Sequence, residues 1–318
     1  MNTKSSTVYA NYPERYFHSQ SRQMVLLPDN YIIILGHLFH KFVMINFEND
    51  KYEISFCKEF IKNSQLNELK LKEMPIEISP CAMCLHEIKE KIFVDDYFKG
   101  FIYIFEYKLK DKRGNKDNLT FTYINHINKL KNRIKVDCIF DLVHDNKNKY
   151  LYASDTNNNV VSVINTGNGK EITYIRIDRP KNIKLYNGAL YVLSETDSEA
   201  RILCFDTKHN ELKKIIKLDK FCCARCLYID NSLIFTTGYQ INNEEIVDWS
   251  NIFLLCYSDE NNTLRYKLKL NFQGLYNMCV LKRRDNVLIF HFLIEYMTKD
   301  KERTFDFIKI PLNTNNMK

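Results

Sequence analysis

Glycine and proline are scarce in this chain, with 8 and 6 among 318 residues, so long flexible linkers are not expected. Tryptophan occurs once. No run approaches the 18 apolar residues that a membrane-spanning helix needs, so we expect no membrane insertion. The opening residues, MNTKSSTVYANYPERYF, lack the apolar segment of a signal peptide. These absences predict a cytoplasmic protein.

The composition is that of a soluble globular protein, with 45% hydrophobic and 27% charged residues. A chain of this length buries about three quarters of its surface, so its core needs no disulfide or metal. The 10 cysteines of an untargeted chain are expected to be reduced thiols. The net charge of +7 permits contact with nucleic acid or an acidic partner but argues for neither.

The sequence contains an internal repeat. The segment CAMCLHEIKEKIFVDDY (81–97) aligns without gaps with CARCLYIDNSLIFTTGY (223–239), sharing Cys, Ala, Cys, Leu, Ile, Phe and Tyr. Internal similarity of this kind is the signature of a repeat architecture.

Further copies share a pattern of short apolar runs separated by polar turns, which is typical of antiparallel strands. Each unit has a first, second, third and usually a fourth run, and units recur at about 40–60 residues, as in propeller blades. The second runs indicate six blades, and they lie at 31–36, 91–96, 150–155, 189–195, 232–238 and 286–292.

The last unit supplies only three strands, and the N-terminal segment STVYAN (6–11) can complete it. Such closure removes an exposed sheet edge. We find no sustained helical periodicity; the best helical candidate is 64–73. The sequence therefore predicts an all-β, six-bladed β-propeller of four-stranded antiparallel blades, closed by an N-terminal strand and forming a single domain over residues 1–318.

Two units resemble blades of NHL-type propellers: SPCAMCLHEIKEKIFVDDYFKGFIYIFEY (79–107), with Pro80 opening strand one and Asp95 closing strand two, and YLYASDTNNNVVSVINTGNGKEITYIRI (150–177). The glycine usual in the first strand of such blades is absent, and no Trp-Asp dipeptide repeats. The resemblance implies a six-bladed propeller, in a family that includes RNA binders.

The CxxC pair Cys81 and Cys84 is predicted to lie on a first strand, as is the pair Cys223 and Cys226. Residues i and i+3 of a strand face opposite sides and span about 10 Å, whereas two thiolates on one zinc lie about 4 Å apart. This spacing favours small apolar side chains packed near the propeller axis. A soft-metal or redox role shared around the axis is the alternative. His86 is expected to be a strand residue near the far rim.

Carboxylates at the ends of second strands could ring the central mouth, namely Asp95, Asp96, Asp155 and Glu195. Gluconolactonase-like propellers bind a divalent cation at that mouth, so a metal-assisted hydrolase or lyase is one alternative function. The commoner role of such residues is to hydrogen-bond the turn backbone. No nucleophile elbow, Walker loop or dinucleotide motif is present, and no cofactor is expected.

Two long segments between second and third runs are the candidates for binding a protein partner, at 239–251 and 294–303. Trp, Tyr and Arg are frequent interface anchors, and long loops on a rigid scaffold often carry binding residues. The predicted partner-binding residues are Tyr239, Asp248, Trp249, Tyr296 and Arg303.

Basic segments at 108–118 and 282–286 are predicted on the opposite face. Asp and Asn interrupt them, and they lack the aromatic residues that stack on bases, which favours solvated turns. An RNA-binding propeller is the second alternative. The prediction that results is a non-enzymatic platform for a protein partner.

Overall fold

The computed structural model describes the strands and most of the C-terminal half of the chain. The described residues are 7–12, 21–27, 31–36, 41–46, 53–56, 80–86, 88–96, 101–109, 119–128, 139–196, 199–241, 247–271, 275–282, 287–297 and 303–317. The helical candidate at 64–73 lies outside them, as do most of the basic segments at 108–118 and 282–286.

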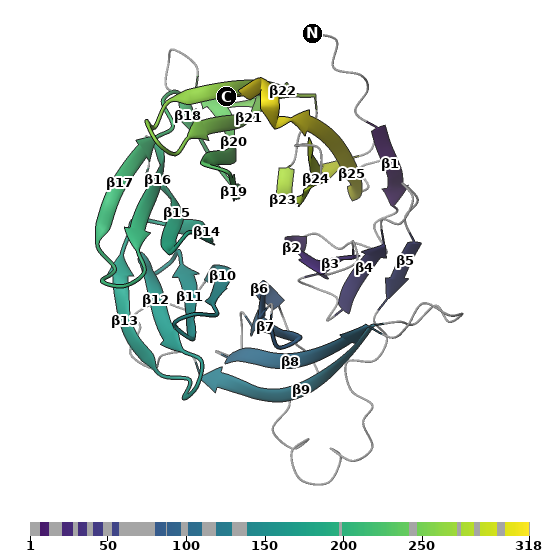
Figure 1. Cartoon of the computed structure of the whole chain (residues 1–318). Helices are drawn as coiled ribbons and strands as arrows, with labels where there is room; N and C mark the ends of the chain where they lie inside the picture. Colours follow the sequence, from purple (N-terminus) through teal and green to yellow (C-terminus); the bar gives the residue numbers. More distant parts are fainter. Residues whose placement is uncertain are drawn as a thin grey trace.

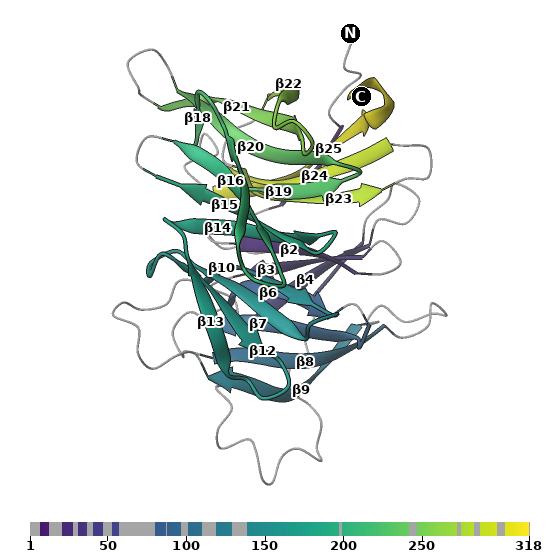
Figure 2. The same cartoon turned by 60° about the vertical axis from the view of Figure 1, so that its left-hand side comes forward.

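The described strands form six antiparallel sheets arranged around a central axis (Figures 1 and 2). From inner to outer edge, the first three sheets contain β2 (Ser21–Leu27), β3 (Tyr31–Gly36), β4 (Lys41–Asn46) and β5 (Glu53–Phe56); β6 (Pro80–His86), β7 (Lys91–Asp96), β8 (Phe101–Leu109) and β9 (Leu119–Asn128); and β10 (Ile139–Asp145), β11 (Tyr150–Asp155), β12 (Val160–Asn165) and β13 (Glu171–Arg176). The next two contain β14 (Pro180–Tyr186), β15 (Ala189–Glu195), β16 (Ala200–Asp206) and β17 (Leu212–Lys217); and β18 (Phe221–Cys222) with β19 (Leu227–Asp230), β20 (Leu233–Ile241), β21 (Val247–Ser258) and β22 (Leu264–Leu270).

The last sheet joins both ends of the chain. It runs β23 (Leu275–Lys282), β24 (Val287–Met297), β25 (Arg303–Asn313) and β1 (Thr7–Tyr12), and a short 3-10 helix, Thr314–Met317, follows. Strand β1 pairs antiparallel with β25, with Thr7 opposite Lys309 and Tyr12 opposite Phe305. The predicted N-terminal closing strand is therefore confirmed.

The innermost strands follow one another around the axis. Contacts join β2 to β6, β6 to β10, β10 to β14, β14 to β19, β19 to β23 and β23 back to β2. This circuit, with one antiparallel sheet radiating from each position, makes the fold an all-β propeller with antiparallel blades, as predicted. Within the described part of the chain, no helix is long and apolar enough to cross a bilayer.

The hydrophobic core lies between neighbouring blades. One cluster joins the blade of β20 to the blade of β24 and includes Phe235, Leu254 and Phe290. A similar cluster fills the neighbouring interface, between the blades of β16 and β21, around Ile202 and Leu255. The second strands β7, β11 and β15 and the third strand β12 are buried on both faces, which explains their continuous apolar runs in the sequence.

Polar turns at the hairpins explain the abundance of Asp and Asn. Asp145, Asp155 and Asp206 each accept hydrogen bonds from backbone N–H groups two or three residues later. The residue four positions after each has a left-handed backbone; these are Lys149, Asn159 and Asn210, each with φ of 57°. Short polar side chains close such turns with their own backbone.

Candidate functional site

One end of the ring gathers the predicted site residues. Pro80 pairs with Asp96, Ile139 with Asp155, and Pro180 with Ser194, so first strands begin where second strands end. We call this end the 2–3 face; it is defined by the paired strand ends Pro80 and Asp96, Ile139 and Asp155, Pro180 and Ser194, and Phe221 and Gln240. A bulge follows the start of β6, β10 and β14 and breaks the regular alternation of side chains there.

The carboxylates proposed as metal ligands are buried on this face but have different local roles. Asp155 accepts hydrogen bonds on both oxygens from Asn158, from the backbone N at 3.1 Å and from Nδ2 at 2.8 Å. Glu195 forms an ion pair with Lys181, in which both side chains are largely buried. Asp95, at the end of β7, is fully buried.

These carboxylates do not converge on one ion-sized position. Among the described residues, one group of three potential ligands has its ligand atoms within 4.8 Å of one another, namely Asp206, His209 and Glu211. That group lies in the turn between β16 and β17. Lys213 Nζ lies 3.0 Å from both carboxylates and already neutralises part of their charge.

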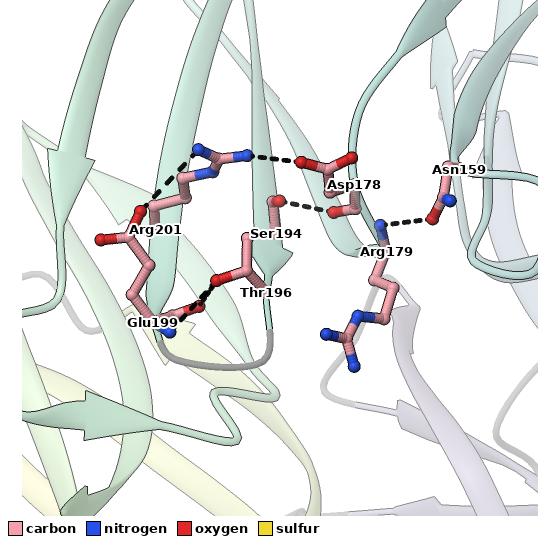
Figure 3. A network of polar contacts seen from close by, with 7 residues as sticks. All are labelled: Asn159, Asp178, Arg179, Ser194, Thr196, Glu199 and Arg201. Atoms are coloured by element: carbon pink, nitrogen blue, oxygen red, sulfur yellow. Dashed lines mark hydrogen bonds and ion pairs between the residues drawn. The ribbon is translucent and has the colours of Figure 1, made fainter. Parts of the chain in front are cut away.

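A network of polar contacts stiffens the 2–3 face between the third and fourth blades of the chain (Figure 3). Arg201 Nη2 donates to Asp178 Oδ2 at 3.1 Å, and its Nη1 lies 3.8 Å from Glu199 Oε1. Ser194 Oγ donates to the Asp178 carbonyl at 2.6 Å, and Arg179 N donates to Asn159 Oδ1 at 2.8 Å. Most partners lie about 15–25 residues apart, so no local sequence pattern indicated this network. It provides a rigid frame around the connections.

Trp249 projects from a bulge in β21. The register pairs Tyr239 with Ile252 but Gln240 with Asp248, so residues 249–251 have no opposite partners. The Trp249 ring packs edge-on against Tyr239, with 5.0 Å between centroids, yet 57% of Trp249 remains exposed. Because β20 and β21 extend further than predicted, Trp249 lies on a strand rather than in a loop.

The structure corrects the roles of the other predicted anchors. Tyr239 is only 5% exposed and belongs to the core cluster, so it supports Trp249 from beneath and cannot itself be an exposed anchor. Asp248 is half-buried and accepts a short hydrogen bond from Asn251 Nδ2, which fastens the bulge. Tyr296 and Arg303 lie on β24 and β25 rather than in a loop, since Met297 pairs with Arg303.

The two CxxC segments differ. Cys81 and Cys84 lie in β6, as predicted, and both are buried. The prediction was wrong for Cys223 and Cys226, because residues 223–226 form a break between β18 and β19. Gly238 permits β18 to approach β20 closely, since a Cβ there would lie 3.2 Å from Phe221 Cβ. Burial raises the pKa of the Cys226 thiol to about 12, as expected for a thiol used in packing.

Two histidines stack at the opposite end of the first strands. The rings of His86, at the end of β6, and His144, in β10, have centroids 4.2 Å apart. The pKa of His144 is lowered to about 4, mainly by burial and secondly by the charge of His86. Burial, followed by Lys89 and Lys91, lowers the pKa of His86.

Acidification is therefore expected to destabilise the fold. The pKa of His144 rises to about 6.5 on unfolding, so the unfolded chain binds more protons and stability falls as pH drops from about 6.5 toward 4. The free energy of unfolding is expected to fall by about 2–3 kcal/mol over this range. This loss of stability is measured by melting temperatures between pH 7.5 and pH 4. The wild type is compared with His144→Phe, which keeps an aromatic ring but cannot bind a proton. Identical pH dependences of the two proteins would contradict this role of His144.

Comparison with known proteins supports the fold alone. No family model matches the sequence, and no curated protein matches it. The fold is a β-propeller. The structure is similar to hydrazine synthase of Kuenenia stuttgartiensis, with a TM-score of 0.57, 12% identity, and coverage of 87% of this chain and 78% of that chain. It is also similar to a protein from Lactobacillus plantarum, with a TM-score of 0.55, 10% identity, and coverage of 91% and 84%. The NHL-type resemblance thus has no support beyond the propeller fold.

Proposed function

We propose that this protein is a non-enzymatic platform that binds a protein partner through the 2–3 face, with Trp249 as the anchor. The observation that carries this proposal is the exposed indole held in a bulge above the buried Tyr239. An aromatic ring that is already packed on one side loses little conformational freedom when a partner covers the other side. Tryptophan is also the residue type most enriched among interface anchors.

The partner chemistry follows from the residues around the indole. Asp248, within the bulge, is engaged with Asn251. With this charge engaged, the indole is the main contact that the bulge offers, and the partner is expected to contribute an apolar pocket.

We also propose that the ring has six blades, each of the six sheets being one blade. The closed circuit of innermost strands and the pairing of β1 with β25 support this count. A complete ring holds the first strands rigidly around the axis, so the 2–3 face does not rearrange on binding.

Replacing Trp249 by alanine is expected to weaken partner binding roughly 30-fold, because an aromatic anchor contributes about 2 kcal/mol or more. The tagged protein is used to isolate the partner from its native cell, and the purified pair is measured by titration. Tyr174→Ala is the matched control, since Tyr174 is also an exposed aromatic residue but lies on the outer strand β13. Unchanged affinity of Trp249→Ala, with loss for Tyr174→Ala, would place the interface on the outer strands.

The RNA-binding alternative predicts a different result. Neutralising Lys282, Arg283 and Arg284 together would then abolish capture and reduce its salt dependence, whereas Trp249→Ala would have little effect. For a protein partner bound at the 2–3 face, the triple variant should bind like wild type.

A further inference from the structure

Two consecutive cysteines lie where the chain leaves β18. Cys222 ends this strand and pairs with Tyr239 of β20. The next residue, Cys223, has a left-handed backbone with φ of 50°, and the sheet resumes only at Leu227. A residue other than glycine keeps this conformation where the surrounding structure holds it in place. The fold therefore fixes the backbone of Cys223 in an uncommon state beside a second cysteine.

This break in the strand brings the two thiols together. In a regular strand, consecutive side chains point to opposite faces, so the thiols of neighbouring residues do not meet. Here the alternation ends at Cys223, and the side chains of Cys222 and Cys223 form a hydrogen bond with each other. The two sulfur atoms are thus neighbours before any reaction takes place.

Cys223 is also accessible from solution. Among the cysteines that the structure describes, Cys223 is partly exposed, whereas the others are all buried. Reactive cysteines are typically partly exposed, and cysteines buried in a core are inert toward reagents in solution. A reagent in solution is therefore expected to react with Cys223, with the buried thiol of Cys222 beside it.

The surroundings of Cys222 suit it to act second. Burial, followed by the charge of Cys223 and its hydrogen bond, raises the pKa of Cys222 to about 12. Glu195 acts in the same direction, whereas Lys181, its partner in an ion pair, acts in the opposite one. Cys222 is therefore a protonated thiol at neutral pH. Its position beside Cys223 replaces a bimolecular encounter and offsets its weak acidity.

We propose that Cys222 and Cys223 are a redox-active dithiol that a low-molecular-weight disulfide oxidises reversibly. The Cys223 thiolate attacks one sulfur of the small disulfide, which forms a mixed disulfide and releases a small thiol carrying the Cys223 proton. The Cys222 sulfur then attacks the Cys223 sulfur, and the second small thiol leaves with the Cys222 proton. The protein loses two electrons and two protons, which the small disulfide gains, and an excess of small thiol reverses the exchange.

Oxidation at this position is expected to disturb the surface around Trp249. Cys222 pairs with Tyr239, whose ring packs against Trp249 with 5.0 Å between centroids. The neighbouring Gly238 lies close to β18, since a Cβ there would lie 3.7 Å from the Cys222 carbonyl oxygen. A disulfide requires a specific geometry of both cysteines, and close packing transmits the resulting shift. Regulation of partner binding rests on the proposed function, whereas formation of the disulfide does not.

The test maps the thiols of the full chain after incubation with oxidised glutathione. Free thiols are alkylated, and the chain is cleaved with trypsin. Trypsin cuts after Lys220 and Arg225, so the peptide 221–225 carries both cysteines of the pair, and Cys226 begins the next peptide. We expect the peptide 221–225 to lose two hydrogen atoms and escape alkylation. Reduced glutathione should restore both thiols.

Variants of the three neighbouring cysteines assign the roles. Cys222→Ala should stop at the mixed disulfide with glutathione, because no second thiol is present to resolve it. Cys223→Ala should slow the reaction of the peptide 221–225 about tenfold or more, because Cys222 is buried. Cys226→Ala is the matched control, since it removes a buried thiol from the same break and should still form the disulfide.

The effect on the Trp249 surface is measured separately. Trp249 is the single tryptophan of the chain, so the fluorescence emission reports on this surface alone. Emission should change on oxidation of the wild type and of Cys226→Ala, and not of Cys223→Ala. Partner affinity should fall about fivefold as the support of the indole shifts. A disulfide that forms without a change in emission would overturn the coupling. Unchanged affinity despite changed emission would contradict the proposed function and leave the dithiol supported.

The wild type alone can overturn the dithiol, so the test stays decisive if a variant does not fold. Full alkylation of the peptide 221–225 after incubation would show that the pair is not oxidised. A disulfide joining this peptide to the one that begins at Cys226 would assign a different pair. A glutathione adduct that persists on Cys223 would show that Cys222 does not reach it.

Discussion

Asp141→Ala is expected to lower the free energy of unfolding by about 3–5 kcal/mol. The substitution leaves three buried donors without their acceptor: Leu142 N, Asn182 Nδ2 and Ile183 N. Each unsatisfied buried donor costs about 1–3 kcal/mol, and partial relaxation keeps the total below the sum. It also removes the tie between β10 and β14, so the loss is expected to be cooperative. Urea unfolding followed by circular dichroism measures the change.

Asp145→Ala is the matched control for that experiment. Asp145 lies at the other end of β10 and also accepts three hydrogen bonds, from Lys147 N, Asn148 N and Asn148 Nδ2. These donors belong to its own turn and remain accessible to water, so we expect a loss of only about 1 kcal/mol. If the two variants lose the same stability, the buried tie between β10 and β14 does not hold the ring.

Deletion of residues 1–12 is the second change with a large expected effect. It removes β1 and exposes the edge of β25, which is otherwise paired from Thr7 to Tyr12. An unpaired edge strand promotes association between chains, and loss of a few kcal/mol lowers the melting temperature by roughly 5–10 °C. Calorimetry and size-exclusion chromatography measure the two effects.

A shorter deletion serves as the control, since removal of residues 1–5 leaves β1 complete. That variant should behave as wild type. A monomeric 1–12 deletion with an unchanged melting temperature would show that the pairing of β1 with β25 contributes nothing to closure.

Much of the fold could be predicted from local patterns. The second runs at 31–36, 91–96 and 150–155 coincide with β3, β7 and β11. Strands β7 and β11 are buried on both faces, so their apolar character is continuous and stops abruptly at polar turns. The closing strand could also be predicted, because the last unit lacks one strand and the N-terminal segment has the pattern of a strand.

Less of the candidate site could be predicted from the sequence. Long loops were expected around Trp249 and Tyr296, but both residues lie on strands, because each hairpin continues past the polar residues. Polar residues around Trp249 and Tyr296 indicate that these segments are exposed. They do not indicate that the strands end there. The residue type alone predicts Trp249 as a binding anchor. Its packing on the buried Tyr239 depends on the register between β20 and β21, which the sequence does not show.

The sequence by itself determined the class of structure, the strand positions and the polar turns, because each depends on periodicity within a few residues. Only the tertiary structure decided the break at 223–226, the bulge at Trp249, and the meeting of Asp141 with Asn182, which lie 41 residues apart. These features follow from strand register and from contacts between blades. A chain specifies them through the packing of all blades together, and no local segment contains that information.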